Sequence, residues 1–309
     1  MSQNTHPCGV LFFDKPKGWT SRQAVNHVIR LFAKPEQKNR KQRPKAGHTG
    51  TLDPLATGML PILLGDATRF SELGLNAEKC YEVIFDLSFQ TNTLDLEGEQ
   101  TARFENVDVS PEHLLTVLKE FEGKISQTPP SFSAIRVDGQ RAHALARQGK
   151  DVQLQARQIE IKSIELLSFV ENKVRLSVAC SKGTYIRSLA RDIGEKLGYG
   201  GCVTMLRRTS TGGWPQQMMV SLEELEEKKE ACILPLQIWL RDLPAMMLQE
   251  LDAKRFVQGQ RLPMASDLPD QVLSCVSFGS DVLGTAMYDA GKQVLQPVRV
   301  LPRAQEKLK

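Results

Sequence analysis

Several features that define whole classes of protein are missing from this chain. The six cysteines include no Cys-x-x-Cys pair, so the sequence predicts neither a zinc site nor a disulfide framework. No apolar run approaches the roughly 20 residues of a membrane-spanning helix, and residues 1–6 lack the basic-then-apolar order of a secretory signal. We therefore expect a cytoplasmic protein with no membrane association, no metal and no other cofactor.

Acidic residues are almost missing between positions 15 and 45. That stretch contains Glu36 alone against ten lysines and arginines, although the net charge of the whole chain is only +4. A run of charge is often just a solvated surface. This one leads directly into a glycine-rich loop, and a positive field beside a site attracts a polyanion. The charge pattern therefore predicts nucleic acid as the partner.

The loop over residues 46–58 is the strongest candidate for a functional site. Glycine recurs in it, which permits a positive φ or a close approach by a ligand. Pro54 biases Asp53 toward an extended or turn conformation, so we expect the Asp53 carboxylate on a bend near His48. The alternative is that Asp53 and Thr57 only hydrogen-bond their own turn.

The same loop carries a family resemblance. Residues 47–60, GHTGTLDPLATGML, closely resemble the catalytic-loop motif of the TruB family, the bacterial tRNA pseudouridine-55 synthases. Further blocks match in the family's order: 9–21, Lys79-x-Tyr81, 181–190 and 206–208. Residues 91–95 resemble a Thr-Asp-Thr-x-Asp turn of the family, from which Asn92 departs. The resemblance covers roughly residues 9–220 well and the remainder weakly.

The resemblance implies an α+β pseudouridine synthase fold, with a mixed, mainly antiparallel sheet flanked by helices. We expect a catalytic domain over 1–242, with an RNA-gripping, thumb-like insertion at 124–153, and a small β domain over 243–309. The small domain falls where the family often places a PUA-like RNA-binding module. Alternating and apolar runs predict strands at 9–16, 79–87, 159–170, 173–180, 272–278, 282–288 and 294–301.

Capping signals predict the helices. Thr20 or Ser21 is expected to cap a helix whose apolar face ends at Phe32, and Asp66 to cap a short helix through Leu73. Ser110, with a proline next to it, predicts a helix with Leu115 among its core residues and Gly123 at its end. A further helix is expected to end near Gly198.

The resemblance also implies roles for seven residues. Asp53 would be the catalytic nucleophile, and Arg187 would hold its carboxylate ionised and oriented. His48 would occupy the space that the base vacates, and Lys15 would lie near the loop. The uracil pocket would be lined by Tyr81, Tyr185 and Leu206. Four of them have an ordinary alternative: Arg187 as a structural arginine, Lys15 as a surface lysine, and Tyr81 and Leu206 as core residues.

The implied reaction converts a uridine in the T loop of tRNA, at position 55, to pseudouridine. The target base must leave its stack, because no side chain reaches C1′ or C6 inside it. Attack by Asp53 at C6 and attack at the sugar carbon both remain open. We expect a monomer that binds the T-arm hairpin without an obligatory protein partner. The alternatives are a synthase for another RNA, an RNA-folding binder and, with the least support, an aspartyl-phosphate enzyme.

Overall fold

The structure is a computed structural model that describes residues 6–37, 39, 42–133, 135–137, 139–146, 148 and 154–308. Three residues of the basic stretch, Lys38, Arg40 and Lys41, lie outside the described residues. So do 147 and 149–153, at the end of the predicted insertion. Within the described chain, no helix is long and apolar enough to span a membrane.

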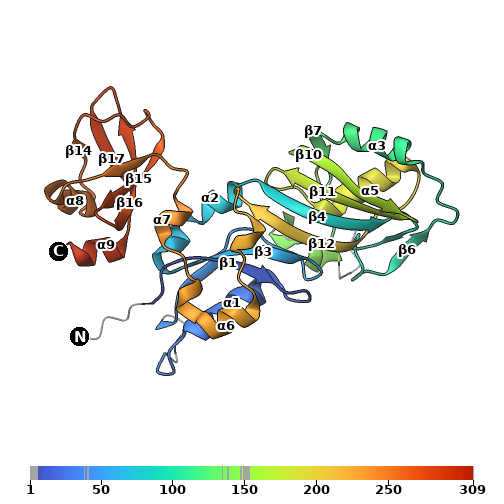
Figure 1. Ribbon diagram of the computed structural model, residues 1–309, viewed down its shortest axis with the longest axis horizontal. Coiled ribbons are helices and arrows are strands. Elements are labelled where there is room, and N and C mark those ends of the chain that lie inside the picture. The colour runs from blue at the N-terminus through green and yellow to red at the C-terminus, as the bar shows by residue number, and fades with distance from the viewer. Residues whose placement is uncertain are drawn as a thin grey trace.

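An eight-stranded sheet forms the larger part of the molecule (Figure 1). Its strand order is β1-β3-β12-β4-β11-β10-β7, with β2 paired to β3. Neighbouring strands are antiparallel except β3 and β12, which are parallel. The strands are β1 (Gly9–Lys15), β2 (Ala46–His48), β3 (Thr57–Leu64), β4 (Lys79–Asp86), β7 (Gly123–Gln127), β10 (Arg157–Val170), β11 (Lys173–Cys180) and β12 (Cys202–Thr211).

Helices cover one face of this sheet. Buried residues of α1 (Ser21–Phe32), α3 (Pro111–Glu120) and α5 (Ile186–Leu197) join one hydrophobic core with the inward side chains of β4, β11 and β12. In Figure 1, α3 and α5 lie beside the β10 and β11 end, and α1 lies beneath β1. The mixed, mainly antiparallel sheet flanked by helices that the sequence predicted is therefore confirmed.

The opposite face of β1 and β3 packs against a second core. Alternate residues of β1 point to opposite faces, so Val10 and Phe12 join this core while Leu11 and Phe13 join the first. The second core also contains residues of α7 (Leu236–Trp239) and of the C-terminal sheet. Along the chain, β3 is followed by η2 (Gly65–Phe70), which contributes Ala67 and Phe70 to this second core, and then by α2 (Ser71–Asn76).

The C-terminal part forms a five-stranded sheet in the order β13-β15-β16-β17-β14. The three longer strands, β15 (Leu273–Phe278), β16 (Asp281–Asp289) and β17 (Val294–Val300), lie where alternation predicted them. Two short strands and two helices were not predicted: β13 (Ala245–Met247), β14 (Leu262–Pro263), α8 (Glu250–Val257) and α9 (Pro302–Lys307).

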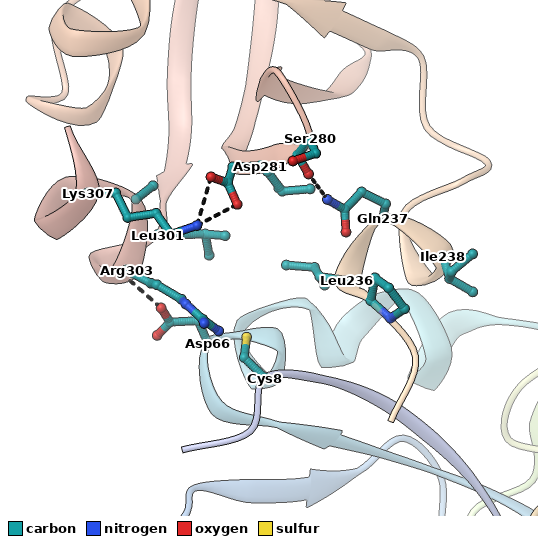
Figure 2. A pocket seen from close by; sticks show the side chains of 13 residues that line it. Cys8, Asp66, Leu236, Gln237, Ile238, Ser280, Asp281, Leu301, Arg303 and Lys307 are labelled. Carbon is teal, nitrogen blue, oxygen red and sulfur yellow. Dashed lines mark hydrogen bonds and ion pairs between the residues drawn. The ribbon is translucent and has the colours of Figure 1, made fainter. Parts of the chain in front are cut away.

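A groove of about 610 Å³ separates α7 from the C-terminal sheet. Figure 2 shows Gln237 of α7 reaching the carbonyl of Ser280, and Lys307 paired with Asp281. The backbone N–H of Arg303 donates to Asp66 across the same groove. None of the residues with a predicted catalytic or substrate-binding role lines it.

The remaining elements are short. A hairpin of β5 (Phe89–Thr91) and β6 (Gln100–Arg103) follows β4, and η3 (Gln216–Met218), α6 (Leu222–Lys228) and η4 (Lys229–Cys232) follow β12. The predicted insertion 124–153 begins inside β7 of the main sheet. It also contains β8 (Arg136–Val137), β9 (Gln140–Arg141) and α4 (Ala142–Ala146).

Most capping predictions are confirmed. Thr20 caps α1 in a capping box with Gln23, Ser110 caps α3, and Gly198 ends α5 with φ 87°. Asp66 was wrong as an N-cap: η2 follows Leu64 without a side-chain cap, and the Asp66 carboxylate accepts from Arg303 instead. Leu115 was wrong as a core residue, because it is 45% exposed on the outer side of α3. That helix ends at Glu120, and Gly123 begins β7.

Candidate active site

The glycine-rich loop joins β2 and β3, which pair with each other, so both of its ends are fixed to the main sheet. Ser21, at the start of α1, secures the middle of the loop. Its hydroxyl accepts from the N–H of Leu52 at 2.7 Å and donates to the Leu52 carbonyl at 3.0 Å. Leu52 and Leu55 are buried in the first core on either side of Asp53. Asp53 therefore stands on a bend that its neighbours anchor.

Asp53 pairs with Arg187, as the family resemblance implied. Nε of Arg187 donates to Oδ2 of Asp53 at 2.9 Å. The Arg187 side chain is 5% exposed, whereas that of Asp53 is 33% exposed. The carboxylate is thus open to a substrate while a buried cation fixes its orientation through a charge-assisted hydrogen bond. The alternative, in which the Asp53 side chain only bonds its own turn, does not describe this geometry.

Arg187 is itself held at three further points. Its Nη1 donates to the carbonyl of Thr93 at 2.7 Å and its Nη2 to that of Phe132 at 3.0 Å. The Asp95 carboxylate lies 3.6 Å from Nε and is almost fully buried. Asp95 is a site residue that the sequence reasoning did not identify. Its signal was present, because the turn over 91–95 was one of the matching family blocks.

The turn over 91–95 is built around Asp95. Its carboxylate accepts from the Thr93 hydroxyl at 2.6 Å and from the N–H of Glu97 at 3.0 Å. Leu94 has a φ of 65°, the left-handed conformation that a tight turn requires. The pKa of Glu97 is raised, first by burial and then by Asp95 and Asp53. Three carboxylates therefore gather around Arg187.

Tyr81 and Leu206 lie on the face of the sheet that bears the first core. Tyr81 of β4 pairs in register with Arg208 of β12, and Val83 pairs with Leu206. Residues two apart on a strand share a face, so all four side chains point the same way. Burial raises the pKa of the Tyr81 hydroxyl, and Arg208 opposes that rise. Tyr81 and Leu206 share their core with Leu52 and Leu55 of the loop.

Lys15 ends β1 beside the loop. It pairs with Gly58 in the β1–β3 ladder and is 0% exposed, so it is not a surface lysine. Its ammonium donates to the carbonyls of Pro16 and Trp19. Burial lowers the pKa of Lys15 to about 8, while the charge of Asp53 raises it. Lys15 is therefore electrostatically coupled to the predicted nucleophile.

His48 precedes Asp53 by five residues on the loop side, and Tyr185 precedes Arg187 by two residues. His48 ends β2, half-buried, and burial followed by the charges of Arg208 and Arg22 lowers its pKa. Tyr185 directly precedes α5, and the side-chain amide of Gln127 holds its backbone by two hydrogen bonds of 2.9 and 3.1 Å. The guanidinium of Arg157 lies 4.7 Å from the Tyr185 ring centre.

The chain is similar along most of its length to known synthases. The family description "TruB family pseudouridylate synthase (N terminal domain)" matches residues 37–186, and "tRNA pseudouridylate synthase B C-terminal domain" matches 187–242. A "tRNA pseudouridine synthase B" from Ralstonia pickettii (strain 12J) is 41% identical over 95% of this chain and 94% of its own. One from Stutzerimonas stutzeri (strain A1501) is 42% identical, with 82% of each chain covered.

Solved structures agree with the sequence comparison. A chain from "Crystal Structure of a Cbf5-Nop10-Gar1 Complex" superposes with a TM-score of 0.70 and 25% identity, covering 95% of this chain and 85% of that one. A chain from "Structure of H/ACA RNP bound to a substrate RNA containing 2'-deoxyuridine" gives a TM-score of 0.69 at 24% identity and has the same fold. This chain belongs to the TruB family of pseudouridylate synthases and is an enzyme.

Proposed function

We propose that this enzyme isomerises the T-loop uridine of tRNA, at position 55, to pseudouridine, with Asp53 as the nucleophile. The names of the relatives, tRNA pseudouridine synthase B, support tRNA as the substrate. The observation that carries the proposal is the Asp53–Arg187 pair, in which an accessible carboxylate is held by an almost fully buried guanidinium. A positioned carboxylate suffices for covalent catalysis of this kind.

The reaction is an isomerisation in which all atoms of the substrate are kept. The C1′–N1 bond breaks, the uracil rotates, a C1′–C5 bond forms, and the proton that leaves C5 is balanced by one that binds N1. Asp53 assists by adding either to C6 of the ring or to C1′ of the sugar. On both routes the Asp53 carboxylate acts as a nucleophile, and Arg187 orients it.

The pocket residues support a base that is flipped out of its stack. Neither C1′ nor C6 is within reach of a side chain while the base is stacked. In our proposal the Tyr81 ring stacks on the extruded uracil, and Tyr185 and Leu206 line the pocket around it. His48 fills the space that the base leaves, and Lys15 adds positive charge behind the loop. The shared face of Tyr81 and Leu206, beside a core that contains Leu52 and Leu55, supports this assignment.

We extend the proposal to the parts that would grip the RNA. The catalytic domain spans 1–242, its insertion at 124–153 closes over the T-arm hairpin, and the PUA-like domain over 243–309 adds a second RNA contact. The basic stretch before the loop steers the polyanion toward Asp53. The enzyme works as a monomer, without an obligatory protein partner, in the cytoplasm where tRNA is matured.

The test is turnover on an unmodified tRNA transcript, with pseudouridine mapped by nucleotide position. We expect modification of the T-loop uridine in the whole transcript and in an isolated T-arm hairpin. A matched transcript with cytidine at that position is expected to give no product. Pseudouridine formed only at another position, or only in another RNA, would contradict the proposed substrate.

A further inference from the structure

Arg208 is a buried cation directly behind the catalytic loop. It is 1% exposed and is among the largest of the fully buried side chains in the described part of the molecule. Strand β12 runs parallel to β3 at this point, with Arg207 and Arg208 in register with Thr57 and Gly58. The backbone of Arg208 therefore lies against the loop's end, where β3 begins.

The guanidinium of Arg208 joins the two arms of that loop. Its Nε donates to the carbonyl of Met59 at 2.7 Å, and its Nη2 donates to that of Gly50 at 3.1 Å. Gly50 lies before Asp53 and Met59 lies after it, so one planar group fixes the separation of both arms. Gly58 permits this approach, because a Cβ there would stand 2.2 Å from the Arg208 carbonyl oxygen.

Arg208 and the neighbouring Arg207 have different electrostatic partners. Arg207 points to the other face and forms a bidentate pair with Asp14 at 2.9 and 2.7 Å. Within the described residues Arg208 forms no ion pair with a carboxylate. Its guanidinium donates to the two loop carbonyls, and its hydrogen bond with the Tyr81 side chain opposes the rise in the pKa of Tyr81. A buried cation without a counter-ion is costly, which argues for a role beyond packing.

We infer that Arg208 is a positioning residue of the catalytic loop: it sets the geometry of Asp53 by clamping Gly50 to Met59 and ties that geometry to its strand partner Tyr81. This role rests on the proposed function of Asp53 as the nucleophile. Misplacing a reacting group by about 1 Å costs on the order of a hundredfold in rate. Because Arg208 is buried away from solvent, its loss is expected to affect kcat and to leave KM for tRNA nearly unchanged.

The first test compares Arg208→Lys with Arg175→Lys. Lysine keeps the charge but lacks the rigid fork that reaches two carbonyls. Arg175, whose two guanidinium contacts go to Glu82 on the neighbouring strand, is the matched control away from the loop. We expect Arg208→Lys to lower kcat roughly tenfold to a hundredfold with KM within about twofold of wild type. The control is expected to keep both values, and Arg208→Met to lose more activity than Arg208→Lys. An unchanged kcat in Arg208→Lys, or an equal loss in the control, would overturn the inference.

The second test needs no substrate. Amide hydrogen exchange over residues 49–58, measured by mass spectrometry, should be faster in Arg208→Lys than in wild type and unchanged in Arg175→Lys. If Arg208→Lys does not fold, Gly50→Ala perturbs the clamp from the loop side, because the backbone φ of 142° at Gly50 disfavours a residue with a side chain. Unchanged exchange would overturn the positioning role even if wild type is active. Faster exchange in an enzyme that makes no pseudouridine would instead overturn the proposed function and support the clamp.

Discussion

Asp53 and Arg187 are 134 residues apart in the chain, yet Nε of Arg187 lies 2.9 Å from Oδ2 of Asp53. The first stands on a loop between two paired strands and the second on the opening turn of α5. Their exposures differ, 33% against 5%, so the group that would react is open and the group that holds it is enclosed.

Replacing Arg187 with lysine keeps the positive charge beside Asp53 but removes the guanidinium, so it tests whether the hydrogen-bond geometry of Arg187 matters. An ammonium cannot reproduce three directed bonds to Asp53, Thr93 and Phe132. We expect kcat to fall roughly a hundredfold while tRNA binding, measured by filter retention, is kept. Arg191→Lys, on the same helix, is the control and should retain activity. Equal activities of wild type and Arg187→Lys would show that the guanidinium geometry is dispensable.

The hydroxyl of Tyr81 is the next group to test. Burial raises its pKa, so at neutral pH it is protonated and can act as a general acid but not as a general base. Tyr81→Phe keeps the ring and removes that proton. If the hydroxyl acts as a general acid, the rate should fall by about 10²- to 10⁴-fold with tRNA affinity unchanged. Turnover of Tyr81→Phe equal to wild type would restrict Tyr81 to a stacking role.

Lys15 should give a specific pH dependence of stability. Its folded pKa of about 8 lies below the ordinary value of 10.5, mainly because it is buried. Between pH 8 and 10.5 the unfolded chain thus binds more protons, and the free energy of unfolding gains a contribution that rises with pH. Below pH 8 both states are protonated, and the buried charge destabilises the fold. Urea unfolding from pH 7 to 10 should show this rise in wild type relative to Lys15→Met. Parallel curves for the two proteins would refute it.

Gly74 of α2 packs against Thr49 of the catalytic loop and Trp239 of α7. A Cβ at Gly74 would lie 2.5 Å from the Thr49 hydroxyl and 2.7 Å from the Trp239 ring. Gly74→Ala is therefore expected to destabilise the fold by about 1–3 kcal/mol through overpacking and to lower turnover. Leu75→Ala, at the next and half-exposed position, should change stability by less than about 0.5 kcal/mol. Chemical denaturation measures the free energy of unfolding of both variants. Equal values for Gly74→Ala and Leu75→Ala would contradict the predicted overpacking at Gly74.

The sequence predicted the elements whose determinants are local. Alternation located β4 and β11 because every second residue is buried there, and Thr20 with Gln23 located the start of α1. Where tertiary contacts decide, the prediction failed. Asp66 has the right chemistry for a cap, but its carboxylate accepts from Arg303, which lies 237 residues further along the chain.

The same distinction applies to the site. A family motif placed Asp53 and Arg187, whose pairing the structure shows. The support of Arg187 by Asp95 and the clamp by Arg208 depend on strand register and on a turn with a positive φ at Leu94. Neither register nor turn geometry can be read from a single sequence, so these partners became visible only in the fold.

The central claim, that Asp53 is the nucleophile of a T-loop pseudouridine synthase, is tested most directly by one comparison. Wild type and Asp53→Asn are each incubated in excess over unmodified tRNA, and pseudouridine in the T loop is measured over time. We expect complete conversion by wild type, and no product from Asp53→Asn although this variant still binds the tRNA. Pseudouridine at the T-loop position made by Asp53→Asn would contradict it.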